Sequence, residues 1–328
     1  LDASRNFANK LWNASRFVIM NLTGEDDKFL PMADYSDGIH KLALKDEDKW
    51  ILSTVNSAAA EITANMEKFE LSLAAQKVYD LIWNNFCDWY IEFVKSRLYG
   101  DDEEDKQVAR AVLVKVLKDL LKMLHPVMPF ITEEIWSCLP VLTDEVTEEN
   151  PKGYLIRQPW PVYDEALSFE EEETIIGRAM EAVRTVRNMR AEVEAAPSKK
   201  VRAIVAASGK AAEYLKKAER HIMTQANVSE IAYVSDKSEV SEEVMSGVLT
   251  DAEILIAMDE LMDYKAESER LTKEKKKLEG EVARVSGKLS NENFVNKAPE
   301  KIIAAEREKL AKYEQMMEQV TKRLEQLA

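Results

Sequence analysis

Glycine and proline are scarce in this chain of 328 residues, which contains nine of each. Together they supply less than half of the ~12% that an average protein devotes to these two residues. An all-β sandwich or barrel needs a turn every ~8–12 residues, and turns draw heavily on glycine and proline. The shortage therefore argues against an all-β architecture and favours a mainly α fold.

Cysteines are also scarce, and the sequence has neither a long apolar run nor an excess of positive charge. The two cysteines, Cys87 and Cys138, are too few for a disulfide framework, which indicates a reducing, cytoplasmic compartment. No run of ~18 uncharged apolar residues occurs, so the sequence predicts no membrane partner. Lys and Arg number 45 against 60 Asp and Glu, a net charge of −15. Without a global basic field, any binding to nucleic acid must use local patches.

The residue types that enzymes use for catalysis form no recognisable site. The three histidines, His40, His125 and His221, lie far apart and belong to no metal-binding pattern such as HExxH. No glycine-rich phosphate loop, GxSxG elbow or dinucleotide fingerprint is present. The sequence therefore predicts neither catalytic residues nor metal ligands in this chain.

Apolar residues repeat at helical spacing through the first half of the chain. This spacing predicts helices over residues 2–22, 46–66, 71–99 and 106–124, and another from 129 onward. The aromatic residues of these segments stand at core spacing and are assigned to packing: Trp83, Phe86, Trp89, Tyr90 and Trp136. Short loops between such helices are typical of an antiparallel helical bundle. Four prolines between residues 140 and 161 end it, and we assign the first domain to residues 1–165.

The pattern changes after this bundle to that of a small α+β module, residues 166–262. Ser168 and Glu171 stand at the spacing of a capping box, which predicts a helix to about residue 195. Short apolar runs then predict strands near residues 201–205, 230–234, 245–249 and 253–258, with a helix over 210–224. The sequence suggests no role for this module beyond spacing.

The last 66 residues change character again. Leu271, Leu278, Val282, Val285 and Leu289 keep the three- and four-residue spacing of a coiled coil, and a second such run follows residues 290–299. We therefore predict an antiparallel coiled-coil hairpin, residues 263–328, with two helices of about 27 residues. This arm carries 15 Lys and Arg against 13 Asp and Glu, a net charge of +2, while the preceding 262 residues carry −17. The arm is the basic part of an acidic chain.

Several strings resemble one family of proteins. RNFANKLWNASRF (residues 5–17), VYDLIWNNFCDWYIEFVK (78–95) and HPVMPFITEEIW (125–136) resemble the anticodon-binding helical domain of class I aminoacyl-tRNA synthetases. RTVRNMRAEVEAAPSKK (184–200) and KLSNENFVNKAP (288–299) are similar to the later domains of bacterial valyl-tRNA synthetases, and the second of these points to valine. The resemblance covers essentially the whole chain in collinear order.

This resemblance implies the C-terminal part of such a synthetase, because the HIGH-like and KMSKS-like signatures of its catalytic domain do not occur. The chain also opens on Leu1 within a helical pattern, which fits a fragment. The chain would then be inactive alone and without cofactors, while the full-length enzyme would use ATP and Mg²⁺ to attach valine to tRNA(Val). Its partners would be tRNA(Val) and the missing catalytic and editing domains, and not DNA.

The first helix offers side chains that suit the reading of single-stranded bases. Amide and guanidinium groups hydrogen-bond base edges, and aromatic rings stack on bases. A similar Asn-Lys-x-x-Asn helix contacts the anticodon in the related methionine enzyme, which favours Asn13 and Arg16. The alternative is that these polar residues tie neighbouring helices together through buried hydrogen bonds. The candidate anticodon-binding residues are Arg5, Asn9, Lys10, Asn13, Arg16 and Phe17, with Trp12 beside them.

In this family the coiled coil meets the outer corner of the L-shaped tRNA. The candidate contacts on the first arm helix are Arg270, Lys277, Arg284 and Lys288. They fall within about 40° of one another around that helix and could follow a phosphate backbone. Glu274 and Glu281 lie beside them, so solvated ion pairs within the helix, worth ~0.2–0.5 kcal/mol each, are an equal alternative. Lys297 and Lys301 near the turn are further candidates.

Two matters stay open at the level of sequence. Arg184, Arg187 and Arg190 follow one another at three-residue steps and fit contact with RNA or with the missing catalytic domain. A function of another class is also open, namely a noncatalytic helical scaffold whose hairpin binds a protein partner. The Asn- and Arg-rich face of the first helix favours RNA, whereas the hairpin fits either function.

Overall fold

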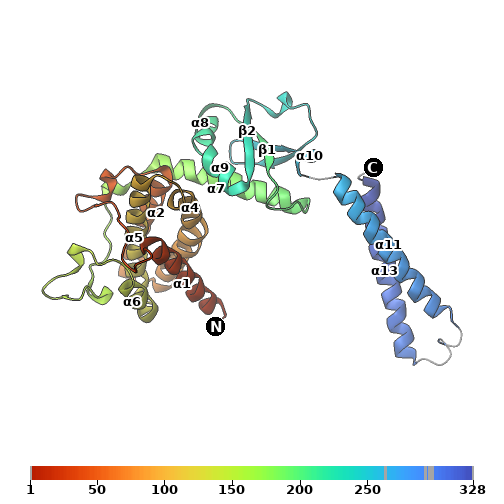
Figure 1. Ribbon diagram of the computed structural model, residues 1–328, viewed down its shortest axis with the longest axis horizontal. Coiled ribbons are helices and arrows are strands. Elements are labelled where there is room, and N and C mark those ends of the chain that lie inside the picture. The colour runs from red at the N-terminus through yellow and green to blue at the C-terminus, as the bar shows by residue number, and fades with distance from the viewer. Residues whose placement is uncertain (1, 262–263, 292–293, 295–298, 327–328) are drawn as a thin grey trace.

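The computed structural model describes residues 2–261, 264–291, 294 and 299–326, and it confirms a mainly helical fold with one small sheet (Figure 1). The bundle contains α1 (Asp2–Leu22), α2 (Asp46–Glu67), α5 (Glu103–Leu124) and α6 (Pro129–Ser137). In chain order, one continuous helical segment stands between α2 and α5 and also belongs to the bundle. This segment consists of α3 (Leu71–Asp80), the π-helix η2 (Leu81–Tyr90) and α4 (Ile91–Leu98).

Helix α5 is the centre of the bundle. It begins at an N-cap, Asp102, whose carboxylate accepts hydrogen bonds from the backbone N–H groups of Glu104 and Asp105, both at 3.1 Å. Such a cap satisfies backbone donors that have no partner inside the helix. From Val108 to Leu124 nearly every residue is buried, and Leu113, Leu117 and Leu120 have no exposed surface. A helix that is buried on all sides is stable only when other elements surround it.

The module combines helix α7 (Glu170–Glu192) with a four-stranded sheet. Its other elements are β1 (Val201–Ala206), α8 (Gly209–Lys217), α9 (Glu219–Ala226), β2 (Val228–Val234), β3 (Val244–Val248), β4 (Glu253–Ala257) and α10 (Met258–Leu261). The strand order is β2-β1-β4-β3, in which β1 and β2 are parallel and the other pairs are antiparallel. The helix predicted over residues 210–224 is in fact two helices, which meet at Ala218.

The predicted capping box at Ser168 is wrong. Helix α7 begins two residues later, at Glu170, and its N-cap position has no side-chain hydrogen bond. The cause is Ser53 of α2, whose hydroxyl accepts a hydrogen bond from the backbone N–H of Phe169 at 3.0 Å and donates one to Glu173 at 2.5 Å. A contact from another helix thus takes the place of the local cap.

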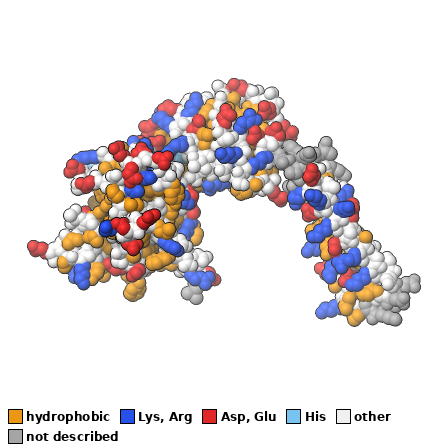
Figure 2. All heavy atoms as spheres, viewed as in Figure 1, with side chains coloured by type: hydrophobic (Ala, Val, Ile, Leu, Met, Phe, Trp, Pro, Cys, Tyr) orange, Lys and Arg blue, Asp and Glu red, His pale blue; other side chains and the backbone are white. Residues whose placement is uncertain are grey.

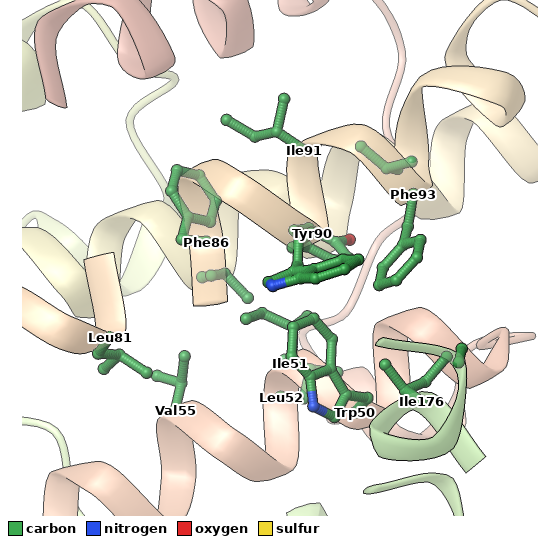
Figure 3. Packing of buried hydrophobic residues seen from close by; sticks show 14 of the residues in the cluster. Trp50, Ile51, Leu52, Val55, Leu81, Phe86, Tyr90, Ile91, Phe93 and Ile176 are labelled. Atoms are coloured by element: carbon green, nitrogen blue, oxygen red, sulfur yellow. The ribbon is translucent and has the colours of Figure 1, made fainter. Parts of the chain in front are cut away.

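The bundle and the module share one hydrophobic core. Figure 3 shows Trp50 of α2 beneath Tyr90 and beside Ile176 of α7, and all three residues belong to this core. Four of the aromatic residues assigned to packing, namely Phe86, Trp89, Tyr90 and Trp136, are buried, which confirms that prediction. Trp83 is half-buried and stacks on Tyr79, with 5.5 Å between the ring centroids. The domain division at residue 165 stays a prediction, and it separates two parts with a common core.

The arm consists of α11 (Tyr264–Leu289) and α13 (Glu300–Gln326), which run antiparallel (Figure 1). Leu271, Leu278 and Val285 of α11 are buried, and Leu271 and Leu278 form a cluster with Val320 that is separate from the main core. In Figure 2 the bundle and the arm extend from opposite ends of the module, with a hollow between them. None of the helices in the described ranges is long and apolar enough to span a membrane.

Candidate nucleic-acid interface

Helix α1 presents a polar face to solvent because its apolar residues all lie on the opposite side. Phe7, Leu11 and Val18 are buried against the bundle. The other side carries Asn9, Trp12, Asn13 and Arg16, which are all exposed, and we call these four residues the α1 face. The exposed fraction of Trp12 is 43%, a high value for so large an apolar ring. An exposed aromatic ring among amide and guanidinium groups is suited to single-stranded bases.

The polar residues of the α1 face have no protein partners within the described part of the chain. No hydrogen bond or ion pair there involves Asn9, Asn13 or Arg16. The alternative that they tie helices together through buried hydrogen bonds is therefore wrong. Their donors and acceptors are free to face a ligand.

The remaining candidates on α1 have other surroundings. The ammonium group of Lys10 lies 2.5 Å from Asp88 and 3.8 Å from the ring centroid of Trp83, so this lysine ties α1 to η2. Arg5 is exposed and forms an ion pair at 3.1 Å with Asp2, one turn before it. Phe17 is half-buried at the edge of the α1 face. Phe17 therefore lies next to the α1 face, whereas the ammonium group of Lys10 is already paired with Asp88.

The π-helix η2 supports α1 from behind. Its hydrogen bonds skip one more residue than those of an α-helix, and such segments are rare and often occur near functional sites. It contributes both partners of Lys10, the carboxylate of Asp88 and the ring of Trp83, to the packing against α1. The sequence assigned Trp83 to the core, and no spacing signal revealed its place beside Lys10.

On the arm, three of the four candidate cations of α11 form ion pairs. Arg270 pairs with Glu274 at 3.3 Å, and Arg284 pairs with Glu281 at 2.5 Å. Lys288 reaches Glu306 of α13 at 2.8 Å, and this hydrogen bond lowers the pKa of the Glu306 carboxyl. The three cations are exposed to solvent, although Glu306 is only 13% exposed, and surface pairs of this kind contribute ~0–1 kcal/mol to stability.

The other arm candidates differ in their surroundings. Lys277 is exposed and has no ion-pair partner among the described residues of the arm. Lys301 is exposed near the start of α13. Lys297 lies outside the described residues. Because the ion pairs of α11 are weak and solvated, their cations can turn to phosphate groups at little cost.

Sequence reasoning missed a buried ionic cluster that joins the bundle to the module. At its centre is Glu47 at the start of α2, which lies 3.1 Å from Arg220 and 3.3 Å from Nε2 of His221, both on α9. Arg97 of α4 approaches the same carboxylate at 3.4 Å. Burial alone would raise the pKa of Glu47, but the hydrogen bond with His221 and the charges of His221, Arg97 and Arg220 lower it to about 2. The cluster therefore holds Glu47 ionised.

Asp48 extends this cluster into the bundle. Arg97 lies 2.6 Å from its carboxylate and 2.8 Å from that of Asp105, and the hydroxyl of Tyr90 donates to Asp48 at 2.9 Å. Burial raises the pKa of Asp48 despite the opposing charge of Arg97. Nowhere in the described ranges do three His, Cys, Asp or Glu side chains stand together as metal ligands. The cluster fastens α2, α4 and α9 to one another.

Comparison with known proteins gives two matching family models. The anticodon-binding domain of tRNA ligase matches residues 48–205, and the valyl tRNA synthetase tRNA binding arm matches residues 263–328. Similar curated proteins include the valine–tRNA ligases of Clostridium perfringens, 46% identical over 328 residues, and Clostridium acetobutylicum, 44% identical over 325. That of Enterococcus faecalis is 38% identical over 327 residues. These alignments cover 99–100% of this chain, which spans about a third (35%) of the length of each relative.

Proposed function

Since the chain belongs to the valyl-tRNA synthetase family, as its C-terminal part, we propose that it binds tRNA(Val) for valylation by the longer enzyme. The α1 face reads bases of the anticodon, and the arm holds the outer corner of the tRNA. The family resemblance supports both assignments, and the relatives carry the name valine–tRNA ligase. The observation that carries the proposal is the exposed α1 face, whose amide and guanidinium groups have no partner among the described residues.

The chemistry of the α1 face suits an anticodon. Anticodon bases are single-stranded, so their edges and their flat faces are both open to a protein. Asn9 and Asn13 each present a donor and an acceptor, and Arg16 presents a planar set of donors. Trp12 and Phe17 supply rings on which a base can stack. This side of α1 therefore offers both hydrogen bonds to base edges and rings for base stacking.

The arm suits a contact that does not depend on the base sequence of the tRNA. It is the basic part of the chain, with a net charge of +2 against −17 for the residues before it. The cations of α11 are exposed, and exposed cations that neutralise phosphates release bound counterions. Such contacts position a nucleic acid without reading its bases.

Activity belongs, in this proposal, to the longer enzyme. Catalytic and editing domains would bind ATP, Mg²⁺ and valine, and this chain would hold the tRNA against them in the cytoplasm. In this proposal residues 1–165 bind the anticodon and residues 263–328 bind the outer corner of the tRNA. Residues 166–262 connect these two domains. The chain alone is expected to be inactive.

A binding titration tests this proposal. Asn13→Ala and Arg16→Ala should weaken binding to tRNA(Val) about 5- to 150-fold each, since a base-edge contact is worth ~1–3 kcal/mol in the DNA case. Their melting temperatures should stay near that of the parent, because both side chains are exposed. Filter binding at fixed salt measures the affinity, and Lys210→Gln, an exposed cation on α8, is the control. A parent chain that binds no tRNA would favour the scaffold function.

A further inference from the structure

A pocket of about 430 Å³ lies at the C-terminal end of α7. Arg187 and Arg190 of α7 line one side of it. Pro197 lines another side, and Gln225 and Asn227 at the end of α9 complete it. Arg187 and Arg190, whose contacts were left open at the level of sequence, therefore line the same pocket.

Arg190 brings a buried positive charge to this pocket. Its exposed fraction is 4%, and its guanidinium donates to the backbone carbonyls of Ala226, Lys199 (2.9 Å) and Asn227 (3.0 Å). Its Nε is buried and has no hydrogen-bond partner in the described ranges, and no carboxylate there forms an ion pair with Arg190. Burial, and then the neighbouring charge of Arg187, lower the pKa of this arginine. A buried charge without a counter-charge is costly, which favours an anion nearby.

The protein compensates only part of this charge. Arg187 donates to the carbonyl of Gln225 at 2.9 Å, so the two arginines together cap the last carbonyls of α9. Asn227 ends this helix in the left-handed conformation, with φ of 49°. The end of a helix carries roughly half a negative charge, so the carbonyls of α9 compensate only part of the charge of the two guanidiniums.

Arg187 is placed to contact such a ligand. It is exposed, unlike Arg190, and its guanidinium lies 5.7 Å from the ring centroid of Trp89. The guanidinium of Arg184 lies 5.1 Å from the same ring. The side chain of Arg187 is thus held at the mouth of the pocket with its charge open to solvent.

The position of the pocket points to the nature of the anion. Helix α7 runs along the edge of the module that borders the hollow between bundle and arm (Figures 1 and 2). Gln225 donates to the backbone carbonyl of Glu92 on α4 at 3.0 Å, and one turn further along α4 the ammonium group of Lys95 lies 5.6 Å from the ring of Phe17. These contacts connect the pocket, through α9 and α4, to Phe17 at the edge of the α1 face.

We propose that this pocket binds a phosphate group of the tRNA backbone, with Arg187 as its ligand and Arg190 as the buried charge beneath it. This inference rests on the proposed function, since it adds a third contact between the α1 face and the arm. Phosphates carry no sequence information, so the contact positions the tRNA and is the same for every tRNA.

Salt-dependent binding of Arg187→Gln tests the proposal. Loss of one phosphate contact should reduce the slope of log affinity against log salt by about 0.7–0.9, for tRNA(Val) and for an unrelated tRNA alike. Ethylation interference on the tRNA should lose its signal at one phosphate cluster outside the anticodon loop and the outer corner. Arg187→Lys keeps the charge and should keep the parental slope, and Lys210→Gln should behave as the parent.

Three results would overturn the proposal. If Arg187→Gln keeps both the slope and the interference pattern while the parent binds tRNA, the pocket does not bind RNA, and the proposed function stands. If the Lys and Gln variants lower affinity equally and also lower the melting temperature, Arg187 only caps α9. If the parent binds no tRNA, the proposed function fails together with this inference.

Discussion

At the scale of single residues, the ionic cluster around Glu47 joins side chains that are far apart in the sequence. The partners of Glu47 lie 50 residues away at Arg97 and more than 170 away at Arg220 and His221. No local pattern connects them, and only the packing of α9 on the bundle brings them together.

The cluster predicts an unusual pH dependence of stability. The pKa of Glu47 is about 2 in the fold, below its ordinary value of 4.5. Its stabilising contribution is therefore complete above pH 4.5 and is lost as the pH falls towards 2, a change on the order of 3 kcal/mol. Asp48, whose pKa is raised, acts in the opposite direction, so only a comparison with a variant isolates Glu47.

Glu47→Gln should destabilise the chain by about 3 kcal/mol near pH 6, because it removes the carboxylate that His221, Arg97 and Arg220 hold ionised. The gap in unfolding free energy between parent and variant should narrow towards pH 2, where about half of the parent carboxyls are protonated. Urea denaturation at both pH values measures this gap. Glu61→Gln, in an exposed pair with Lys77 on the same bundle, is the matched control and should cost less than ~1 kcal/mol at either pH. An equal gap at pH 6 and pH 2 for Glu47→Gln would contradict the assignment.

At the scale of elements, most helices and strands were predictable to within a few residues, because their apolar periodicity is strong. The exceptions arise from contacts between elements. Ser168 fails to cap α7 because Ser53 takes over the local hydrogen bonds. The π-helix η2 is apolar on several sides, so its sequence does not distinguish it from the α-helices that it joins.

The arm offers a prediction at this scale, because its core is separate from the main core. Leu278→Asp should place an unpaired charge in the arm core and unfold the hairpin, at a cost of ~3 kcal/mol or more. Helical circular dichroism should fall by the share of α11 and α13, while the bundle and module melt at the parental temperature. Glu279→Ala, an exposed neighbour, should leave both signals unchanged. Loss of the bundle's melting transition in Leu278→Asp would show that the arm and the bundle unfold as one unit.

At the scale of the whole molecule, an acidic chain carries three local surfaces that are positively charged or polar: the α1 face, the pocket at Arg187 and the cations of α11. The α1 face could be predicted from sequence, and so could the cations of α11. The pocket at Arg187 could not, because its lining combines the end of α7 with Pro197 and with Gln225 and Asn227 at the end of α9, which no local pattern connects. An acidic body with local basic surfaces limits non-specific binding of polyanions to those surfaces.

The arm provides the last prediction, in which electrostatics separates the two interpretations of the α11 cations. The variant replaces four residues by glutamine: Arg270, Lys277, Arg284 and Lys288. If each neutralises a phosphate, the slope of log affinity against log salt should fall by about 0.7–0.9 per contact, equally for any tRNA. Fold stability should change little, because the ion pairs lost are exposed.

The matched control removes four cations from α13 instead, namely Arg307, Lys309, Lys312 and Lys322. It lowers the net charge of the arm by the same amount, so a general loss of positive charge would change both slopes equally. Contact through α11 predicts a reduced slope for the α11 variant only. A parental slope for the α11 variant would mean that its cations form solvated ion pairs, and a reduced slope for the control would move the RNA contact to α13.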